Sequence, residues 1–236
     1  MSETDHVRAL MEADRWIDRV NVQKTRLPEM AELATLESVL RQLLGELKVA
    51  EASLAPVKSA YDEVARESKR LKDRARNLDA TLATSTAHAR ELTALQGELT
   101  HVRSLLSESE DRELDLLLRV EPLEDEVASI KRRAQPGVLR RSELTETIAQ
   151  LRSSLDDELV ALKDARVVKA TALPAALLAR YDAALVHAGS SGAAQVIEGR
   201  CDGCRLALSP LDYDRFKSLP LDTFMDCPEC GRLLVP

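Results

Sequence analysis

A repeating pattern of apolar residues dominates the N-terminal and central parts of this chain. In residues 33–82 the apolar positions recur in alternating steps of three and four, and only Ser68 places a polar side chain among them. The same spacing returns over residues 92–134 and continues as a helical stripe over residues 144–162. Such a repeat is the a/d seam of a coiled coil, so the sequence predicts long helices that pack along one edge.

A short polar stretch separates the two seams. Serine and threonine cluster in residues 83–88, and these side chains favour caps and turns over a helix interior. Two seams joined by a short turn most simply form an antiparallel hairpin, with its tip near residues 82–90. Each distal arm would have about 50 residues, on the order of 75 Å. A parallel coiled-coil dimer is the alternative, and Ser109 and Glu113 are polar layers where the seam is weakest.

Proline and glycine interrupt both arms. Pro28 separates an amphipathic N-terminal helix (residues 3–26) from the first seam, and Gln135–Gly137 interrupts the second. In an antiparallel hairpin with its apex near residues 82–86, Pro28 falls level with residues 136–144. We therefore expect both arms to break at one height, with a bend near residues 28 and 136–137 that makes the hairpin hook-like.

All four cysteines lie near the C-terminus, as two CxxC pairs. Cys201 and Cys204 are followed after 22 residues by Cys227 and Cys230. Each pair places two thiolates on one tight turn, and two such turns supply the four ligands of a structural zinc site. Two disulfides or two redox pairs are the alternatives. We favour zinc because nothing at the N-terminus resembles an export signal and no βαβ pattern precedes either pair.

A zinc ion bound by four cysteines would hold a fold and would leave no coordination position for substrate. Gly203 and Gly231 lie in the two turns, where we expect glycine to accommodate positive φ. Tyr213, Phe216 and Phe224 lie between the cysteine pairs and are expected to form a small core. The sequence thus predicts one structural zinc ion and no catalytic role for it.

The composition argues against an enzyme and a membrane protein. Aromatic residues make up only 3% of the 236 residues, charged residues 31%, and the net charge is −7. No apolar run approaches the roughly 18 residues that a membrane-spanning helix needs. Phosphate-binding loops and nucleophile motifs are absent, and the four histidines form no motif with a carboxylate or serine. We expect a cytoplasmic protein without catalytic residues, small-molecule substrate or membrane contact.

The C-terminal region is predicted to form a second domain, residues 173–236, after a helical region of residues 1–172. A helix should begin after Pro174, and residues 193–197 and 233–235 have the composition of short strands. The expected fold is mainly α, with a long antiparallel coiled-coil hairpin and a small C-terminal β zinc ribbon. We expect the N-terminal helix, the end of the return helix, the Pro174 helix and the ribbon to form one base.

These features together resemble the bacterial coiled-coil C4-type zinc-ribbon family. The resemblance covers nearly the whole chain and is most specific in the ribbon. Its matching residues are Gly199, Cys201, Cys204, Cys227, Pro228, Cys230, Gly231, Arg232 and Leu234. Relatives are thought of as non-enzymatic adaptors, some tied to flagellar or secretion regulation through sigma-54 or RNA. The resemblance implies this class of function and leaves the partner open.

Basic charge is concentrated away from the ribbon. Residues 199–236 carry five basic and six acidic side chains, and a zinc–thiolate cluster adds roughly two more negative charges. A basic cluster at the expected bend carries no acid. It consists of Lys131, Arg132, Arg133, Arg140 and Arg141. We expect an adaptor for a protein partner, as a monomer or weak dimer. A regulator that binds RNA or DNA through this cluster and the ribbon is the alternative.

Overall fold

The computed structural model describes residues 2–85 and 88–236, which fall into two compact units. One unit combines the chain up to Ala31 with Leu144–Pro236, and the other is Glu32–Glu143. The helices are α1 (Glu3–Thr25), α2 (Pro28–Thr84), α3 (Ala89–Ala170), α4 (Ala175–Ala188) and α5 (Pro210–Lys217). The strands are β1 (Ala193–Ile197), β2 (Arg200–Cys201), β3 (Met225–Asp226) and β4 (Leu233–Val235). The predicted mainly α fold with a small C-terminal β region is confirmed.

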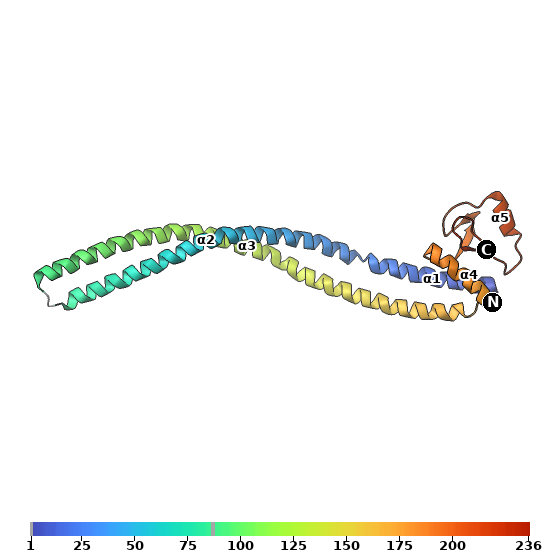
Figure 1. Ribbon diagram of the computed structural model, residues 1–236, viewed down its shortest axis with the longest axis horizontal. Helices are drawn as coiled ribbons and strands as arrows, with labels where there is room; N and C mark the ends of the chain where they lie inside the picture. Colours follow the sequence, from blue (N-terminus) through green and yellow to red (C-terminus); the bar gives the residue numbers. More distant parts are fainter. Residues whose placement is uncertain (1, 86–87) are drawn as a thin grey trace. The chain divides into compact units, whose positions relative to one another are not determined.

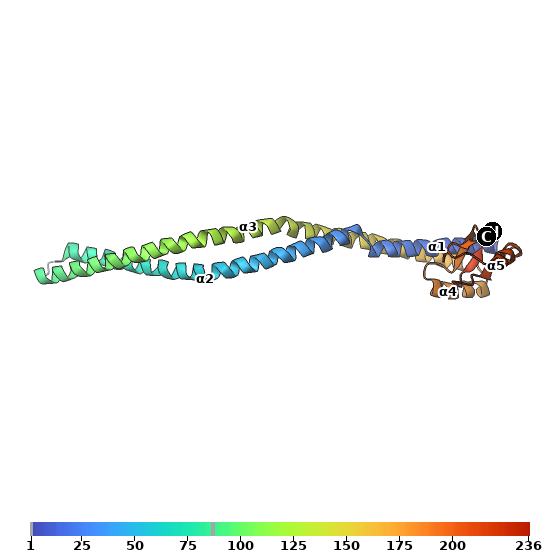
Figure 2. The ribbon, with the colours of Figure 1, turned by 90° about the horizontal axis from the view of Figure 1, so that it is seen from above.

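Within the Glu32–Glu143 unit, α2 and α3 run side by side and antiparallel, as the two views agree (Figure 1, Figure 2). Lys131 pairs with Glu51 at 2.9 Å, whereas nearer the tip Arg74 pairs with Glu98 at 2.6 Å. Higher numbers on α3 therefore meet lower numbers on α2, which confirms the hairpin. The part of the predicted tip at residues 86–87 lies outside the described residues.

The two serines in the predicted seam face each other. Ser109 is fully buried and Ser68 nearly so, and their hydroxyl oxygens lie 2.9 Å apart. Each hydroxyl therefore finds its hydrogen-bond partner across the seam, as buried polar groups require. Two of the three polar positions in the predicted seam, Ser68 and Ser109, thus form one polar layer. This layer favours one alignment of the arms, because a shifted register would bury each serine against an apolar side chain.

The predicted register and the predicted break at Gln135–Gly137 are both wrong. Arg152 contacts the sulfur of Met30 at 3.4 Å, so Pro28 lies level with residues near 152 rather than with 136–144. Helix α3 continues through Pro136. One proline costs about 3 kcal/mol, and a packed seam on both sides outweighs it. A Cβ on Gly137 would lie 3.0 Å from Leu40 Cδ2, so this glycine allows close helix packing and does not end the helix.

Helix α1 is capped and stopped as its sequence requires. Ser2 and Asp5 form a capping box, in which the Ser2 hydroxyl accepts from the Asp5 N–H. In return the Ser2 N–H donates to the Asp5 carboxylate at 3.0 Å, and this bond, with the Ser2 hydroxyl and the charge of Arg8, lowers the pKa of the Asp5 carboxyl. The helix ends at Thr25, and α2 begins at Pro28, where a missing N–H has no consequence. The interruption predicted at Pro28 is therefore confirmed.

The unit that contains both termini has its main core between α1, α4 and the sheet. Fully buried members come from four elements: Leu10 of α1, Tyr181 of α4, Ala193 of β1 and Leu233 of β4. Ala170 and Leu173, at the end of α3 and just after it, complete the cluster. The predicted base of N-terminal helix, return-helix end, Pro174 helix and ribbon is confirmed by this shared core.

The ribbon is a four-stranded sheet in the order β2-β1-β4-β3. Strand β1 pairs antiparallel with β2 and parallel with β4, while β3 pairs antiparallel with β4. Glu198 and Gly199 both have positive φ between β1 and β2, as a two-residue hairpin turn requires. Both strands predicted from the sequence are present, whereas helix α5 was not predicted. No helix in the described part of the chain is long and apolar enough to cross a membrane.

Candidate metal centre

The four cysteine sulfurs converge on one point. All four lie within 4.8 Å of one another, with Cys201 and Cys230 3.8 Å apart and Cys204 and Cys227 3.9 Å apart. Ligands about 2.3 Å from a tetrahedral zinc ion lie about 3.8 Å apart, which matches these two sulfur pairs, so the donor set suits a tetrahedral zinc ion. The thiols are free, which removes the disulfide alternative.

The two CxxC turns have the same backbone design. The N–H of Arg205 donates to the Cys201 carbonyl at 2.7 Å, and the N–H of Gly231 donates to the Cys227 carbonyl at 2.9 Å. Arg205 has φ +65° and Gly231 φ +70°, so the residue after each second cysteine is left-handed. Glycine adopts this conformation freely and arginine does not. The two turns therefore have the same backbone shape, but only the first is strained, at Arg205.

We predict opposite effects from exchanging side chains at these two positions. Arg205→Gly should tighten zinc binding about fivefold, because it relieves about 1 kcal/mol of left-handed strain. Gly231→Ala should weaken zinc binding by a similar factor, since φ alone opposes the methyl group and nothing lies within 4 Å of it. Competition with a colorimetric chelator measures both. Equal zinc affinities of the two variants would contradict the inferred difference in backbone strain between Arg205 and Gly231.

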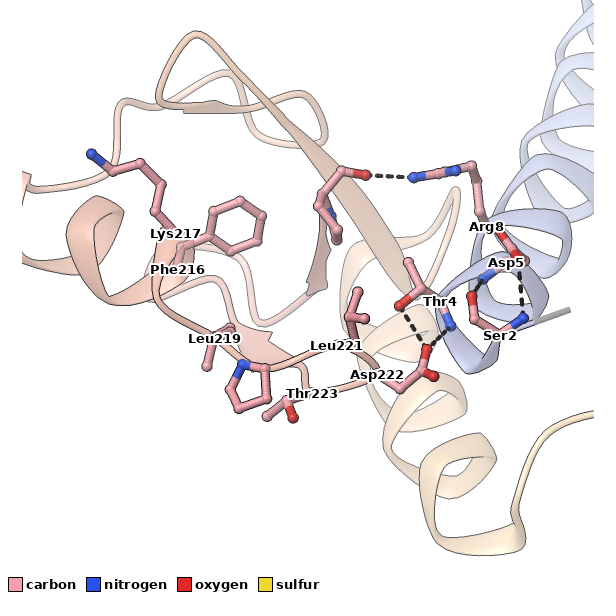
Figure 3. Close-up of a pocket in the computed structure, with 12 residues that line it drawn as sticks. Ser2, Thr4, Asp5, Arg8, Phe216, Lys217, Leu219, Leu221, Asp222 and Thr223 are labelled. Carbon is pink, nitrogen blue, oxygen red and sulfur yellow. Dashed lines mark hydrogen bonds between the residues drawn. The ribbon is translucent and has the colours of Figure 1, made fainter.

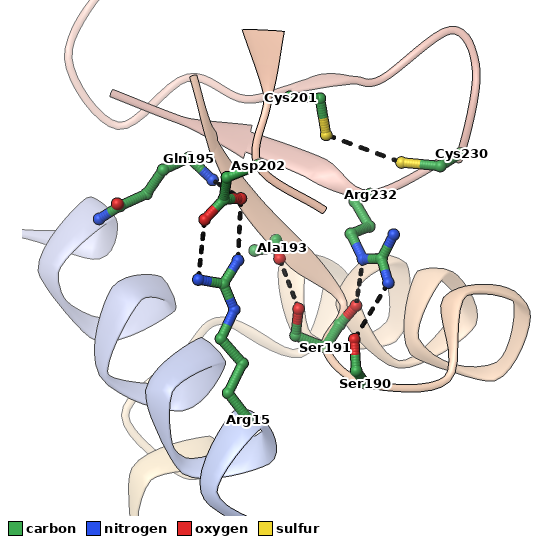
Figure 4. Close-up of polar contacts among 9 residues, drawn as sticks. All are labelled: Arg15, Ser190, Ser191, Ala193, Gln195, Cys201, Asp202, Cys230 and Arg232. Atoms are coloured by element: carbon green, nitrogen blue, oxygen red, sulfur yellow. Dashed lines mark hydrogen bonds and ion pairs between the residues drawn. The ribbon is translucent and has the colours of Figure 1, made fainter. Parts of the chain in front are cut away.

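Gly203 has a role different from the one predicted. Its φ is not positive, and a Cβ there would lie 2.7 Å from Cδ of Arg232. Arg232 is buried and donates to the carbonyls of Ser191 at 3.1 Å and Ala188 at 2.8 Å, and to the Ser190 hydroxyl at 3.2 Å. Figure 4 shows Arg232 directed at Ser190 and Ser191, in the segment that follows α4. Gly203 is required for space, because the Arg232 side chain lies where a Cβ would be.

The protein environment acts differently on the thiols. Burial raises the pKa of Cys201 to about 12 despite hydrogen bonds from the Gly203 and Cys204 N–H groups. Burial also raises the pKa of Cys227. At Cys230 burial opposes ionisation, but hydrogen bonds from Arg232 outweigh it and lower the pKa to about 7. A buried thiolate needs a cation, which bound zinc supplies.

The metal centre shares its sheet with the core of the base. Side chains alternate along a strand, so Leu233 and Val235 of β4 pack with α1 and α4, whereas Leu234 packs with Cys201 and Cys227. In β1, Ala193 and Ala194 divide between the two sides in the same way. The order that zinc imposes on the sheet therefore extends to the surface on which α1 lies.

Arg15 joins α1 directly to the first cysteine turn. Its two terminal nitrogens contact the two carboxylate oxygens of Asp202 at 2.8 Å each, and the Gln195 N–H donates to the same carboxylate at 2.8 Å (Figure 4). Asp202 stands between Cys201 and Cys204. A bidentate arginine–carboxylate pair fixes orientation as well as distance, so docking of α1 positions the turn that carries two ligands.

The first turn of α1 is tied to the ribbon around a pocket of about 530 Å³ (Figure 3). The N–H and hydroxyl of Thr4 donate to Asp222 at 2.8 and 3.0 Å. Arg8 donates to the Pro236 carbonyl at 2.6 Å. Phe216 and Leu219 line its apolar wall. These bonds hold the chain between α5 and β3 against α1 and show that the ribbon does not stand apart from the helices.

A buried polar network lies on the other side of α1. Asp14 accepts from the Tyr181 hydroxyl at 2.7 Å and from Arg166 Nε at 2.6 Å. Arg166 also donates to Asp182 at 2.8 Å. Burial and the Asp14 charge raise the pKa of Tyr181, so its hydroxyl remains a donor. Hydrogen bonds to Asp14 and Asp182 raise the pKa of Arg166 against the opposing effect of burial. The network joins α1, α3 and α4.

Sequence reasoning found the four cysteines and missed their supporting residues. Asp14 lies within the apolar stripe of the N-terminal helix, and a carboxylate at such a position is the one signal in the sequence that indicates a buried partner. The aromatic core was predicted only in part. Tyr213 and Phe216 pack near the cysteines, but Phe224 belongs to the core with α1 and α4.

The basic cluster at residues 131–141 lies on exposed surface of α3 and is partly neutralised. Lys131 pairs with Glu51, Arg133 with Glu46 at 3.2 Å, and Arg140 with Glu32 at 2.8 Å. Arg132 is exposed, and Arg141 lines a shallow surface depression with Glu37. The cluster contacts acidic residues of α2 within its own unit.

Comparison with known proteins agrees with both parts of the fold. Residues 10–189 match the model of the CT398-like coiled coil hairpin domain, and residues 200–234 match that of the C4-type zinc ribbon domain. The uncharacterized protein Rv2229c of Mycobacterium tuberculosis is 25% identical over 239 residues, covering 96% of this chain and 92% of that protein.

Two solved structures share the fold. A protein from Mycobacterium smegmatis superposes with a TM-score of 0.80 at 21% identity, covering 100% of both chains. CT398 from Chlamydia trachomatis superposes with a TM-score of 0.62 at 19% identity, covering 98% of this chain and 96% of that one. Together with the clustered sulfurs, the ribbon match identifies the metal as one structural zinc ion.

Proposed function

Because this chain belongs to the CT398-like coiled-coil hairpin family and ends in a C4-type zinc ribbon, we propose that it is a non-enzymatic adaptor that binds protein partners. Four cysteines complete the coordination of the zinc ion, so the metal holds the ribbon and has no position left for a substrate. The long paired helices and the zinc-stabilised base provide surfaces for binding.

Ion pairs between the basic cluster and α2 favour a protein partner over nucleic acid. Lys131, Arg133 and Arg140 each contact a glutamate of α2. A nucleic-acid site gains affinity by neutralising phosphates with free cationic side chains, and a cation already paired with a carboxylate contributes less. This internal pairing is the observation that carries the proposal.

Two of the five basic residues of the ribbon are similarly engaged, whereas Arg200, Arg205 and Arg215 are exposed. Arg232 is buried against backbone carbonyls, and Lys217 pairs with Asp214 at 2.8 Å. The thiolate cluster adds negative charge beside them. The six acidic side chains of residues 199–236 and the thiolate cluster outnumber the three exposed arginines, so the net charge of the ribbon opposes binding to a nucleic-acid backbone.

Photo-crosslinking in the cells that produce the protein tests the proposal. A photoreactive amino acid is placed at Leu118 on α3 or at Leu211 on α5, which are 60% and 80% exposed. A control carries it at Leu144, which is buried. We expect discrete protein adducts at an exposed position and none at the control. Adducts sensitive only to nuclease, with salt-dependent gel shifts of RNA or DNA, would instead establish the nucleic-acid alternative.

A further inference from the structure

Helix α3 carries a second apolar stripe opposite the seam that packs on α2. Leu114 and Leu118 are 55% and 60% exposed and lie one turn apart, so their side chains share one face. The seam at this height contains Ser109 and Val120, both buried. At 100° per residue, Leu114 and Leu118 lie on the side of α3 that faces away from these positions, where α2 cannot cover them.

Acidic side chains surround this leucine pair. The carboxylates on or beside the same helix face are exposed, and none takes part in an ion pair or side-chain hydrogen bond within residues 2–85 and 88–236. They are Glu110, Asp111, Asp115, Glu121 and Asp125. Glu124, which faces α2, pairs with Lys58 instead. Within the described residues, the carboxylates of the outer face therefore form no ion pairs, whereas Glu124, beside the seam, forms one with α2.

We propose that this acidic leucine ridge, Leu114 and Leu118 with the five carboxylates, docks a basic amphipathic helix of a partner protein. The inference rests on the proposed adaptor function and names the partner's chemistry. Leucine or other apolar side chains of the partner would cover the pair, and flanking lysine or arginine would meet the carboxylates. Helix-on-helix recognition commonly combines such an apolar stripe with flanking charges of opposite sign.

A second copy of this chain fits the ridge less well. The basic run of α2, residues 66–76, has complementary charge, with six basic and two acidic residues. Its apolar members Leu71 and Ala75 face the seam, where Leu71 is half-buried and Ala75 buried. The exposed face of that run would neutralise the carboxylates but leave Leu114 and Leu118 without an apolar partner, so charge and apolar contact together favour a different protein.

Fluorescence anisotropy with the full-length zinc-bound protein tests the ridge. The probe is a labelled helical peptide of about 18 residues, with leucines at helical spacing and lysines elsewhere. Changing both leucines to glutamine (L114Q/L118Q) keeps helix propensity and removes the apolar stripe. We expect the peptide to bind the unmodified protein and the double variant to bind about tenfold more weakly.

Two further variants distinguish binding at the ridge from non-specific binding elsewhere on the helices. Neutralising acids (E110Q/D111N/E121Q/D125N) should also weaken binding about tenfold and remove most of its salt dependence between about 0.05 and 0.3 M. The control L44Q/V49Q changes residues of α2 that are 51% and 69% exposed in the same unit, and should bind the peptide like the unmodified protein. Circular dichroism verifies that each variant is folded.

Several results would overturn the ridge as a docking site. The leucine pair is not recognised if L114Q/L118Q binds the peptide as tightly as the unmodified protein. The same conclusion follows if L44Q/V49Q weakens binding as much as L114Q/L118Q does. Loss in L114Q/L118Q of a dimer seen by sedimentation would assign the ridge to a second copy. Protein adducts at Leu211 together with peptide binding that ignores the ridge would refute the ridge while leaving the adaptor function intact.

Discussion

Extraction of the zinc ion is expected to abolish hydrogen-exchange protection in β1 and β4 and to loosen α1, while the α2–α3 seam stays protected. Structural zinc contributes about 10 kcal/mol or more to the folding of small zinc domains. The two strands have one face on the cysteines and the other on α1 and α4, so their loss removes the surface under Leu10 and Met11. The seam around Ala50, Val127 and Ile130 forms a separate core.

Hydrogen exchange with mass spectrometry, after a chelator has removed the metal, measures this pattern directly. Trp16 is the only tryptophan and lies on α1 next to Arg15, so its fluorescence reports on the same helix. Addition of zinc should restore both signals. Replacing Cys201 and Cys227 with serine should reproduce the metal-free pattern. Protection of β1 and β4 that persists in metal-free protein would show that the sheet is stable without the ion.

Removal of the Arg166 side chain should be the most destabilising single change outside the zinc ligands. Arg166→Met leaves the carboxylate of Asp14, which is 6% exposed, with only the Tyr181 hydroxyl as partner. Breaking a buried ion pair on one side costs about 3–5 kcal/mol. We expect about 3 kcal/mol, since Arg166 itself is 21% exposed.

Urea unfolding followed by Trp16 fluorescence measures this loss. The control Arg152→Met changes an exposed arginine of the same helix and should cost less than about 0.5 kcal/mol. The double variant Asp14→Leu/Arg166→Met removes both charges and should recover part of the stability, because no buried charge is left alone. A cost under about 1 kcal/mol for Arg166→Met would show that solvent or Asp182 compensates for the missing guanidinium.

The hairpin could be predicted from the sequence, but its register could not. Leucines at a seven-residue repeat bury the same surface in several alignments, so the apolar pattern alone leaves the alignment open. Contacts that differ between alignments select one, such as the Ser68–Ser109 pair and the pairing of Lys131 with Glu51. The prediction that both arms break at one height depended on the predicted alignment, and it is wrong because that alignment is wrong.

The break predicted at Gln135–Gly137 shows a second limit. Proline and glycine oppose a helix by their local preferences, but Leu40 packs against Gly137 and the helix continues. At Pro28 the same local preference succeeds, because the proline lies where α2 starts and needs no N–H donor. Local rules fail in this chain where packing on both sides of a residue compensates for them.

The sequence by itself determined the long helices, the antiparallel hairpin and the four zinc ligands, because heptad spacing and paired CxxC turns each permit few structures. The tertiary structure decided the register, the role of Gly203 and the way in which the ribbon is joined to α1. These depend on contacts between residues far apart in the chain, such as Arg15 with Asp202 and Asp14 with Arg166. No local pattern encodes such contacts, since each becomes favourable only when folding buries both partners together.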